Sequence, residues 1–280
     1  MKLAIITGAD GGMGTEITRE VARKGYHVVM ACHEHKHAEQ VREAIVKETG
    51  NENIEVIGLD LANLESVAAF ADILLKRGEP ISLLMNNAGT LETKRSFTVD
   101  GLERTVSVNY VGPYPLTRKL VPLMEQGTRV VNMVSCTYAL GFLNFPWFFT
   151  HGRKGSFWRI PVYSNSKLAL SLFSIKLSRF LKEKGITVNA ADPGVVSTKI
   201  ITMKIWLVDV LCDIFFRPFI LTPRQGADNA IRLLLEPQYE GQTGLLKVFK
   251  QAHPFGRKYQ QHPKLEELWQ RTEEIVSRYL

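Results

Sequence analysis

Cysteine is scarce in this chain of 280 residues, where only Cys32, Cys136 and Cys212 carry a thiol. These three residues lie far apart and form no Cys-x-x-Cys pair, so the sequence holds no pattern for a disulfide framework. The apolar run near the N-terminus is too short for a secretory signal. Both features favour a reducing compartment, and we expect a cytoplasmic protein.

Long uninterrupted apolar runs are missing as well, and the nearest candidate, residues 205–221, contains three charges. Asp209, Asp213 and Arg217 recur every four residues, which places them on one side of a helix. This spacing predicts an amphipathic helix that Pro218 would end or kink. Such a helix suits either a lid over a substrate or a peripheral contact with a membrane surface.

The charge balance is basic but diffuse. There are 35 basic and 28 acidic residues, a net charge of +7, without a dense run of Arg or Lys. The sequence also lacks zinc-finger and helix-turn-helix patterns, so we expect no nucleic-acid partner. The net charge fits an anionic cofactor or an anionic membrane face instead.

Short apolar, β-branched runs alternate with helical patterns along most of the chain. Because this alternation produces βαβ units, we expect an α/β protein of Rossmann type: doubly wound, with a mainly parallel seven-stranded sheet and helices on both faces. Residues 1–280 are expected to form one domain, closed by a helix at about 263–279. The expected strands are 2–7, 27–32, 54–59, 81–86, 129–134, 186–191 and 244–249, and the expected helices are 13–24, 36–49, 63–77, 99–122 and 161–183.

Two segments interrupt the alternation. Residues 141–160 contain seven aromatic side chains, and residues 196–221 include the amphipathic pattern. Long irregular segments in a compact domain are usually functional, and apolar walls suit a bulky apolar ligand. We expect both segments to flank the substrate; alternatively, the aromatic residues pack as core or as the face of a homodimer.

The stretch "TGADGGMG", residues 7–14, follows the first expected strand and opens the first expected helix. Glycines there permit a tight turn and let the backbone approach a pyrophosphate, while the helix N-terminus offers free N–H groups to phosphates. A simple strand–helix turn also uses glycine, but the succession of strand, loop, helix and second strand predicts dinucleotide binding. The predicted contacts are Gly8, Asp10, Gly11, Gly12, Met13 and Gly14.

The stretch "YSNSK", residues 163–167, places Tyr163 four positions before Lys167. On a helix these two side chains share one face. A free tyrosine titrates near pH ~10, and a neighbouring ammonium favours the phenolate, which brings proton transfer toward neutral pH. The pair therefore suggests an acid/base group; by itself it also fits an exposed helical pair.

Together with "NNAG" (86–89) and "DPG" (192–194), these motifs resemble the short-chain dehydrogenase/reductase family in order and spacing. The resemblance covers roughly residues 1–245 and looks closest to the retinol-dehydrogenase-like branch. It implies that hydride transfer is the cofactor's chemistry, with the protein supplying position and charge.

The resemblance also implies roles for four residues. Tyr163 would be the general acid/base, and Lys167 would lower its pKa and hold the nicotinamide ribose. Ser135 would bind the reacting oxygen, and Asn109 would anchor a water relay to Lys167. Without the resemblance, "NNAG" reads as a turn that ends a strand, and the Asp of "DLANLES" as a helix cap. The further cofactor contacts that the resemblance implies are Asp60, Leu61, Asn87, Ala88, Gly89, Pro193, Gly194 and Val196.

The end of the second expected strand, "MACHEHK", bears on the choice of cofactor. An acid there binds the 2′-hydroxyl of NAD, and a basic residue accommodates the 2′-phosphate of NADP. The resemblance places Cys32 where NAD users carry Asp and His33 where NADP users carry Arg. His35 and Lys36 add basic character, while Glu34 opposes it. We therefore expect NADP(H) more than NAD(H).

These features predict an NADP(H)-dependent oxidoreductase for a small hydrophobic alcohol or carbonyl, with retinoid, steroid and xenobiotic carbonyl all open. One alternative is an NAD-dependent dehydrogenase, and another is a nucleotide-binding sensor or scaffold of the same fold without turnover. A third is a membrane-contacting protein that uses residues 205–221. His33, His35 and His37 alternate but lack an obvious fourth ligand, so we expect no metal.

Overall fold

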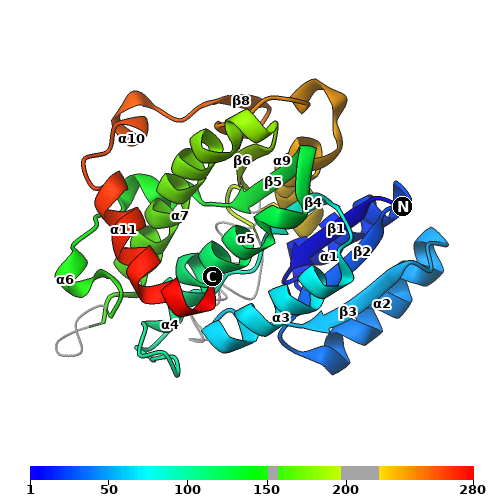
Figure 1. Ribbon diagram of the computed structural model, residues 1–280, viewed down its shortest axis with the longest axis horizontal. Coiled ribbons are helices and arrows are strands. Elements are labelled where there is room, and N and C mark those ends of the chain that lie inside the picture. Colours follow the sequence, from blue (N-terminus) through cyan, green and yellow to red (C-terminus); the bar gives the residue numbers. More distant parts are fainter. Residues whose placement is uncertain (151–156, 197–220) are drawn as a thin grey trace.

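The computed structural model describes residues 1–150, 157–196 and 221–280 of the chain. The eight strands of these parts lie in one sheet in the order β3-β2-β1-β4-β5-β6-β7-β8 (Figure 1). Neighbouring strands are parallel except at the end of the sheet, where β8 runs antiparallel to β7. The strands are β1 Leu3–Thr7, β2 His27–Cys32, β3 Ile54–Gly58, β4 Ile81–Asn86, β5 Met124–Met133, β6 Thr187–Asp192, β7 Leu245–Val248 and β8 Gln251–Pro254.

The expected mainly parallel Rossmann-type sheet is confirmed, with one strand more than expected. The additional strand, β8, has the sequence QAHP and offers no apolar run to recognise. Its Pro254 is tolerated because an edge strand has one side without ladder hydrogen bonds. Strand β5 also begins earlier than expected, at Met124.

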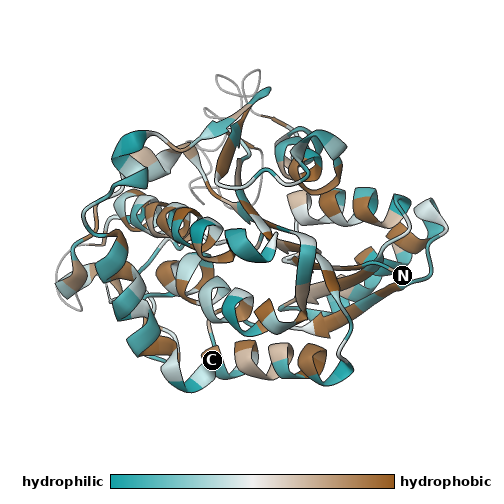
Figure 2. Ribbon diagram, turned by 45° about the horizontal axis from the view of Figure 1, so that its top comes forward, coloured by the Kyte–Doolittle hydropathy of each residue, from teal (hydrophilic) through white to brown (hydrophobic). Residues whose placement is uncertain are grey.

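Helices cover both faces of the sheet. Helices α1, α2 and α9 bury their apolar sides against one face, and α3, α5 and α7 against the other. Figure 2 shows apolar residues concentrated in the strands and on the inner sides of the helices. Because both faces are covered, the central strands are apolar at nearly every position. These helices are α1 Gly12–Arg23, α2 His35–Thr49, α3 Leu64–Arg77, α5 Pro113–Leu120, α7 Arg159–Leu181 and α9 Pro223–Leu235.

The strand order reverses direction between β1 and β4, since β2 and β3 extend the sheet on one side and β4 extends it on the other. In open parallel sheets, ligands bind outside the carboxyl ends of the strands at such a switch point. Strand β1 ends at Thr7 and β4 ends at Asn86. The fold therefore brings the glycine loop and the "NNAG" stretch together at the expected place.

The helix expected over 99–122 is broken into several pieces. Helix α4, Arg104–Val106, passes into the π-helix η1, Ser107–Val111, where the N–H of Gly112 donates to the carbonyl of Ser107 at 2.8 Å. A regular helix then resumes as α5. Single π turns inside helices are frequent at functional sites, and this one carries Asn109.

The aromatic segment 141–160 divides between core and surface. Helix α6, Phe145–Phe148, buries Phe145 and Phe148 in the same core as α7. Trp147 and Trp158, in contrast, are exposed. The alternative that these aromatics pack as core therefore applies to part of the segment. Most of the segment 196–221, including the amphipathic pattern at 205–221, lies outside the described residues; its two ends meet in a bridge between Val196 and Leu221.

Near the C-terminus, the short helix α10, Arg257–Gln260, leads to α11, Leu265–Val276, within the expected range. Helix α11 lies against α7 on the outer side of the molecule (Figure 1). Among the parts that the structure describes, no helix combines the length and apolar character that crossing a membrane requires.

Candidate active site

The glycine loop closes tightly against the end of β4. Gly8 has a φ of +59°, and a Cβ at this position would lie 3.0 Å from the Cα of Ala88. A Cβ on Gly14 would lie 2.0 Å from the carbonyl oxygen of Gly8. Both positions therefore require glycine, one for its left-handed backbone and both for space.

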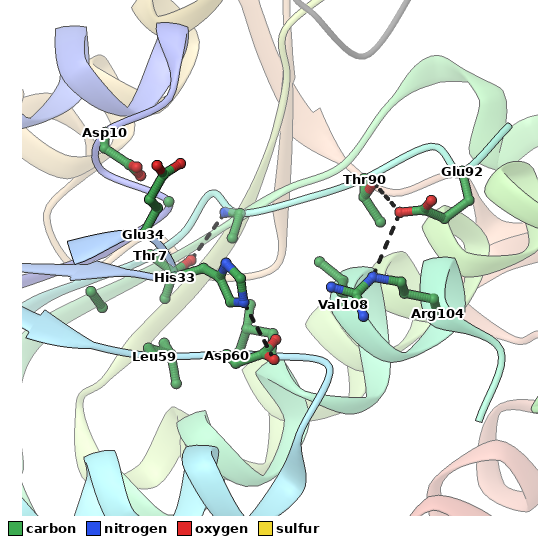
Figure 3. A pocket seen from close by; sticks show the side chains of 14 residues that line it. Thr7, Asp10, His33, Glu34, Leu59, Asp60, Thr90, Glu92, Arg104 and Val108 are labelled. Carbon is green, nitrogen blue, oxygen red and sulfur yellow. Dashed lines mark hydrogen bonds and ion pairs between the residues drawn. The ribbon is translucent and has the colours of Figure 1, made fainter. Parts of the chain in front are cut away.

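Helix α1 begins at this loop with Gly11 as its N-cap, and no side chain of the described residues caps it. Its first N–H groups and the positive end of its dipole therefore remain available to an anion. A cavity of about 310 Å³ opens beside the loop (Figure 3). The cavity is lined by Thr7, Gly8, Asp10, Ala31, His33, Glu34, Leu59, Asp60, Leu61, Ala88, Thr90, Glu92, Arg104 and Val108.

Asn87 connects the segment after β4 to the end of β1 and the glycine loop. Its Nδ2 donates to the carbonyl oxygens of Thr7 and Gly8 at 3.0 and 3.1 Å, and its backbone N–H donates to Thr7 Oγ1 at 3.0 Å. The N–H of Ala88 donates to the same hydroxyl at 3.0 Å. The Oδ1 of Asn87 is buried without a hydrogen-bond partner among the described residues. An orphaned acceptor, a glycine cradle and an uncapped helix fit a dinucleotide, whose phosphates and amide groups would meet them.

Side chains at the end of β2 point alternately to the two faces of the sheet. Ala31 and His33 line the cavity, whereas Cys32 is buried on the opposite face, where burial raises the pKa of its thiol to about 12. The charge of Asp10, which lines the cavity, raises this pKa further, so Cys32 lies beside the cavity wall and its expected place at the ribose stays a prediction. Glu34, which the sequence placed past the strand end, lines the cavity near Asp10 (Figure 3).

Asp60 lines the cavity, and its expected contact with the cofactor stays a prediction. The alternative that it caps α3 is wrong, because the side chain of Asn63 caps this helix. The Oδ1 of Asp60 accepts a hydrogen bond from the N–H of Ala62 at 2.8 Å, and its Oδ2 lies 3.6 Å from His33 Nε2 across the cavity mouth. Leu61 lines the same wall, and its carbonyl oxygen accepts a hydrogen bond from Ser107 Oγ at 3.1 Å. The structure thus brings His33, Asp60 and Leu61 together as predicted.

The "DPG" turn continues the site on the other side of the loop. Gly194 has a φ of +73°, and its N–H donates to Asp192 Oδ1 at 2.9 Å. Val196 is buried against Gly226 of α9, which also approaches the sulfur of Met13. Met13 and Val196 therefore meet over α9 and support the loop. The cofactor role of Pro193 stays a prediction.

The carboxyl end of β5 and the first turns of α7 bring together Ser135, Tyr163 and Lys167. Ser135 follows β5 and makes a side-chain hydrogen bond with Tyr163. Lys167 is 3% exposed; its Nζ donates to the carbonyl oxygen of Met133 at 2.8 Å and lies 5.6 Å from the centre of the Tyr163 ring. A Cβ on Gly89 would lie 3.5 Å from this Nζ, so the ammonium also borders the "NNAG" stretch.

Burial dominates the pKa values of this cluster. Burial raises the pKa of Tyr163 to about 12; the hydrogen bond from Ser135 lowers it, and the charge of Asp192 raises it. Burial also lowers the pKa of Lys167 to about 8. The expected lowering of the Tyr163 pKa by Lys167 and the oxidised nicotinamide stays a prediction. In the chain without cofactor, Tyr163 therefore keeps its proton at neutral pH and can act as a proton donor.

Asn109 lies in the π-helix and is fully buried. Its Oδ1 accepts from the N–H of Thr90 at 2.7 Å, and its Nδ2 donates to the carbonyl of Thr90 at 2.9 Å and to Ser166 Oγ at 3.0 Å. The side chain thus fixes the segment after β4 to α7. Its proposed part in a water relay stays a prediction, since its side-chain atoms already have partners.

The residues of the cavity wall that escaped the sequence reasoning include the polar residues Thr90, Glu92 and Arg104. Thr90 Oγ1 donates to Glu92 Oε1 at 2.9 Å, and Arg104 Nε lies 3.8 Å from the same oxygen. Figure 3 places this polar wall opposite His33. Thr90 directly follows "NNAG", which was a usable signal, whereas Arg104 reaches the cavity only because the helix after residue 99 breaks.

No cluster of three potential metal-binding side chains occurs in the described residues. His33 faces Asp60, and His35 lies 4.0 Å from Glu39 on α2, so these two imidazoles point to different partners.

Comparisons with known proteins agree with this geometry. The model of a family described as short chain dehydrogenase matches residues 2–205. Polyprenol dehydrogenase of Mus musculus is 34% identical over 264 residues, which cover 91% of this chain and 78% of the relative. Retinol dehydrogenase 11 of Homo sapiens is 33% identical over 247 residues, which cover 87% of this chain and 76% of the relative.

Solved structures share the fold. An uncharacterized protein from Mycobacterium paratuberculosis matches with a TM-score of 0.76 at 26% identity, covering 99% of this chain and 94% of its own. An actinorhodin polyketide ketoreductase matches with a TM-score of 0.65 at 22% identity, covering 86% and 93%. The second likeness concerns the fold alone.

Proposed function

Because the chain belongs to the short-chain dehydrogenase family, we propose that it is an oxidoreductase that interconverts a hydrophobic alcohol and its carbonyl with a nicotinamide dinucleotide. The observation that carries the proposal is the convergence of Ser135, Tyr163 and Lys167 beside the glycine-loop cavity. A sensor or scaffold would need the cavity but has no need of an acid beside it.

Each residue of the cluster has a task that its position supports. When bound, the dinucleotide would supply or accept the hydride. In reduction, Ser135 would donate a hydrogen bond to the substrate oxygen, and Tyr163 would donate its proton to that oxygen as charge develops there. The ammonium of Lys167, held at the end of β5, would return a proton toward Tyr163. The cradle residues Gly8, Gly14 and Asn87 would hold the phosphates and the amide groups of the cofactor.

The substrate class is proposed from the relatives and from composition. The relatives named above act, by their names, on polyprenol and on retinol. Phe142 and Trp158, which lie in the chain between β5 and α7, are exposed aromatic side chains. An apolar ligand would remove this surface from water.

For the cofactor we propose NADP(H). The N-terminus of α2 carries no side-chain cap among the described residues and has His35 and Lys36 in its first turn, so it would attract a 2′-phosphate. His33 at the cavity mouth adds a donor. The alternative, NAD(H), is favoured by Glu34, whose carboxylate lines the same cavity and would repel a phosphate.

A turnover screen tests the proposal. Purified protein is mixed with lipophilic aldehydes and ketones in the presence of NADPH or NADH, and with retinol and polyprenols in the presence of NADP+ or NAD+. The absorbance of the reduced cofactor is followed in each case. We expect turnover that Tyr163→Phe abolishes. Cofactor binding by calorimetry without turnover of any substrate would instead favour the sensor or scaffold.

A further inference from the structure

Asp192, the last residue of β6, lies at the catalytic cluster. The N–H of Val134 donates to the carbonyl of Ala191 at 2.9 Å, so the ends of β5 and β6 remain paired up to this point. Ala190 packs in the core on the α7 side, and alternation turns Asp192 to that side as well. The carboxylate therefore lies opposite the end of β5, where the ammonium of Lys167 is anchored on Met133.

The carboxylate is fixed in place. Asp192 is 2% exposed, and its Oδ1 accepts the hydrogen bond from Gly194 at 2.9 Å. Its backbone carbonyl accepts a hydrogen bond from Asn229 Nδ2 of α9 at 2.7 Å. A buried carboxylate is expensive unless a nearby charge or donor compensates it, so the surroundings of Asp192 must supply that compensation.

Four titratable side chains feel this charge. The charge of Asp192 raises the pKa of Tyr163 and Lys167 on α7, and of Cys136 and Tyr138 in the turn after β5. From α9 it meets the neutral Asn229, and its sheet neighbour on β7 is Val248. The side chain of Lys247, the preceding residue of β7, lies over the Tyr239 ring on the opposite face. Among these groups, in the part of the chain that the structure describes, Lys167 is thus the one that carries a positive charge near Asp192.

We propose that Asp192 is a positioning residue that acts as the counter-ion of Lys167 and keeps the protons on both Lys167 and Tyr163, which poises the site toward carbonyl reduction at neutral pH. The proposal rests on the function proposed above. Reduction transfers a hydride from the reduced cofactor to the carbonyl carbon and the phenolic proton of Tyr163 to the carbonyl oxygen. Oxidation of the alcohol needs the same residue as phenolate, which a nearby negative charge disfavours.

The directions of the pKa shifts agree with this role. Burial lowers the pKa of Lys167 to about 8, and Asp192 is the group that opposes the lowering. Burial raises the pKa of Tyr163, and Asp192 raises it further. For Asp192 itself, burial raises the pKa of the carboxyl, while the Gly194 N–H and the Lys167 charge lower it. The three groups therefore form one coupled cluster.

The first test needs neither cofactor nor substrate. Lysine side chains are isotope-labelled, the Lys167 resonance is assigned by its loss in Lys167→Arg, and its titration is followed by NMR. In the wild type we expect a midpoint near pH 8. Asp192→Asn keeps an acceptor for Gly194 but removes the charge, and we expect the midpoint to fall by about one pH unit. An unchanged midpoint in a folded variant overturns the proposal.

A matched control is Glu103→Gln, which neutralises another fully buried carboxyl that does not act on Lys167. It should leave the Lys167 midpoint in place. If Asp192→Asn does not fold by circular dichroism, Asp192→Ser provides a smaller neutral residue that still offers an oxygen to Gly194. A shift of equal size in Glu103→Gln would attribute the effect to general loosening and overturn the proposal.

The second test compares the pH profiles of both reaction directions. In Asp192→Asn, the rising limb of kcat for alcohol oxidation should move to lower pH by about one unit. With saturating substrates at neutral pH, kcat for oxidation relative to kcat for reduction should rise roughly tenfold, with KM values changing so that the equilibrium constant is unchanged. A titration shift of Lys167 without any change in the profiles overturns the claim of direction. If no substrate is turned over at all, the proposed function fails, while the cofactor-free titration still decides the role of Asp192.

Discussion

The ammonium of Lys167 donates a hydrogen bond to the backbone carbonyl of Met133, with 2.8 Å between Nζ and O. This bond joins α7 to the carboxyl end of β5 and fixes the charge beside Tyr163. Because Lys167 is 3% exposed, it has exchanged most of its water for this carbonyl and for the field of Asp192. The site therefore holds a charge that stability alone would not favour.

Replacing this lysine should stabilise the fold. The pKa of Lys167 is lowered from 10.5 to about 8, so the unfolded chain binds more protons than the folded chain between these values. The destabilisation is fully present below pH 8 and is relieved as the pH rises toward 10.5. We expect Lys167→Met to gain at most about 1–3 kcal/mol at pH 7. The lost bond to Met133 and the lost compensation of the Asp192 carboxylate reduce this gain.

Urea unfolding at several pH values measures this gain. The stability difference between Lys167→Met and the wild type should be largest below pH 8 and should shrink above it. The control is Lys176→Met on the same helix, whose ammonium pairs with Glu266 at the surface, at 2.6 Å. A gain in Lys167→Met that does not depend on pH would contradict the assignment to its charge.

Tyr163→Phe should lower kcat by a factor of about 10² to 10⁴ and leave dinucleotide binding nearly intact. The hydroxyl gives up a proton to the substrate oxygen, whereas the glycine cradle holds the cofactor. Tyr138→Phe is the control, because Tyr138 packs edge-on against Tyr259 near the same site. Steady-state kinetics and calorimetry separate the two effects; near-native kcat in Tyr163→Phe would refute the acid/base role.

Gly14→Ala should destroy the dinucleotide site and destabilise the fold by roughly 2–4 kcal/mol. Its Cβ would lie 2.0 Å from the carbonyl oxygen of Gly8 and 2.9 Å from the Cα of Ala9, and backbone atoms cannot rotate away. Gly11→Ala is the matched control, since its Cβ would meet the same oxygen at 3.4 Å. Thermal unfolding with and without cofactor should separate the variants, and equal losses would count against the cradle geometry.

The predictable part of the fold is the part that local chemistry decides. Strands β1, β2 and β4 were found near their expected bounds because helices cover both faces and force continuous apolar runs. Strand β8 was missed because an edge strand needs no such run. The π-helix depends on the backbone hydrogen bond between Gly112 and Ser107, which no periodic pattern in the sequence predicts.

The candidate site shows the same division. The glycine loop and "YSNSK" were recognised because their spacing encodes backbone shape and one helical face. The expected place of Cys32 at the ribose stays a prediction, because strand alternation puts Ala31 and His33 in the cavity wall and leaves Cys32 beside it. The high pKa of Tyr163 could not be foreseen, since it depends on burial by segments distant in sequence.

Charge at the cavity mouth should set the choice of cofactor. Glu34→Gln removes the carboxylate that opposes a 2′-phosphate, and we expect NADPH affinity to rise roughly tenfold while NADH affinity changes little. Glu43→Gln, on the exposed part of α2, serves as the control for net charge. Calorimetric titration with both cofactors measures the effect. Wild-type protein that binds NADH more tightly than NADPH would overturn the proposed preference.

The last prediction concerns the outer side of α7, which is buried at most of its positions and therefore needs a cover. Helix α11 supplies part of it: Trp269 stacks on Phe173 at 6.0 Å between ring centres, and the guanidinium of Arg118 lies 4.9 Å from the Trp269 ring. We expect Trp269→Ala to cost about 2–4 kcal/mol and to expose apolar surface that favours self-association. Trp158→Ala, which removes an exposed tryptophan, is the control. Sedimentation of the wild type and both variants decides between two models. If α11 covers this face, the wild type should be monomeric and Trp269→Ala should self-associate. If the face forms a homodimer, the wild type should be dimeric and Trp269→Ala should dissociate.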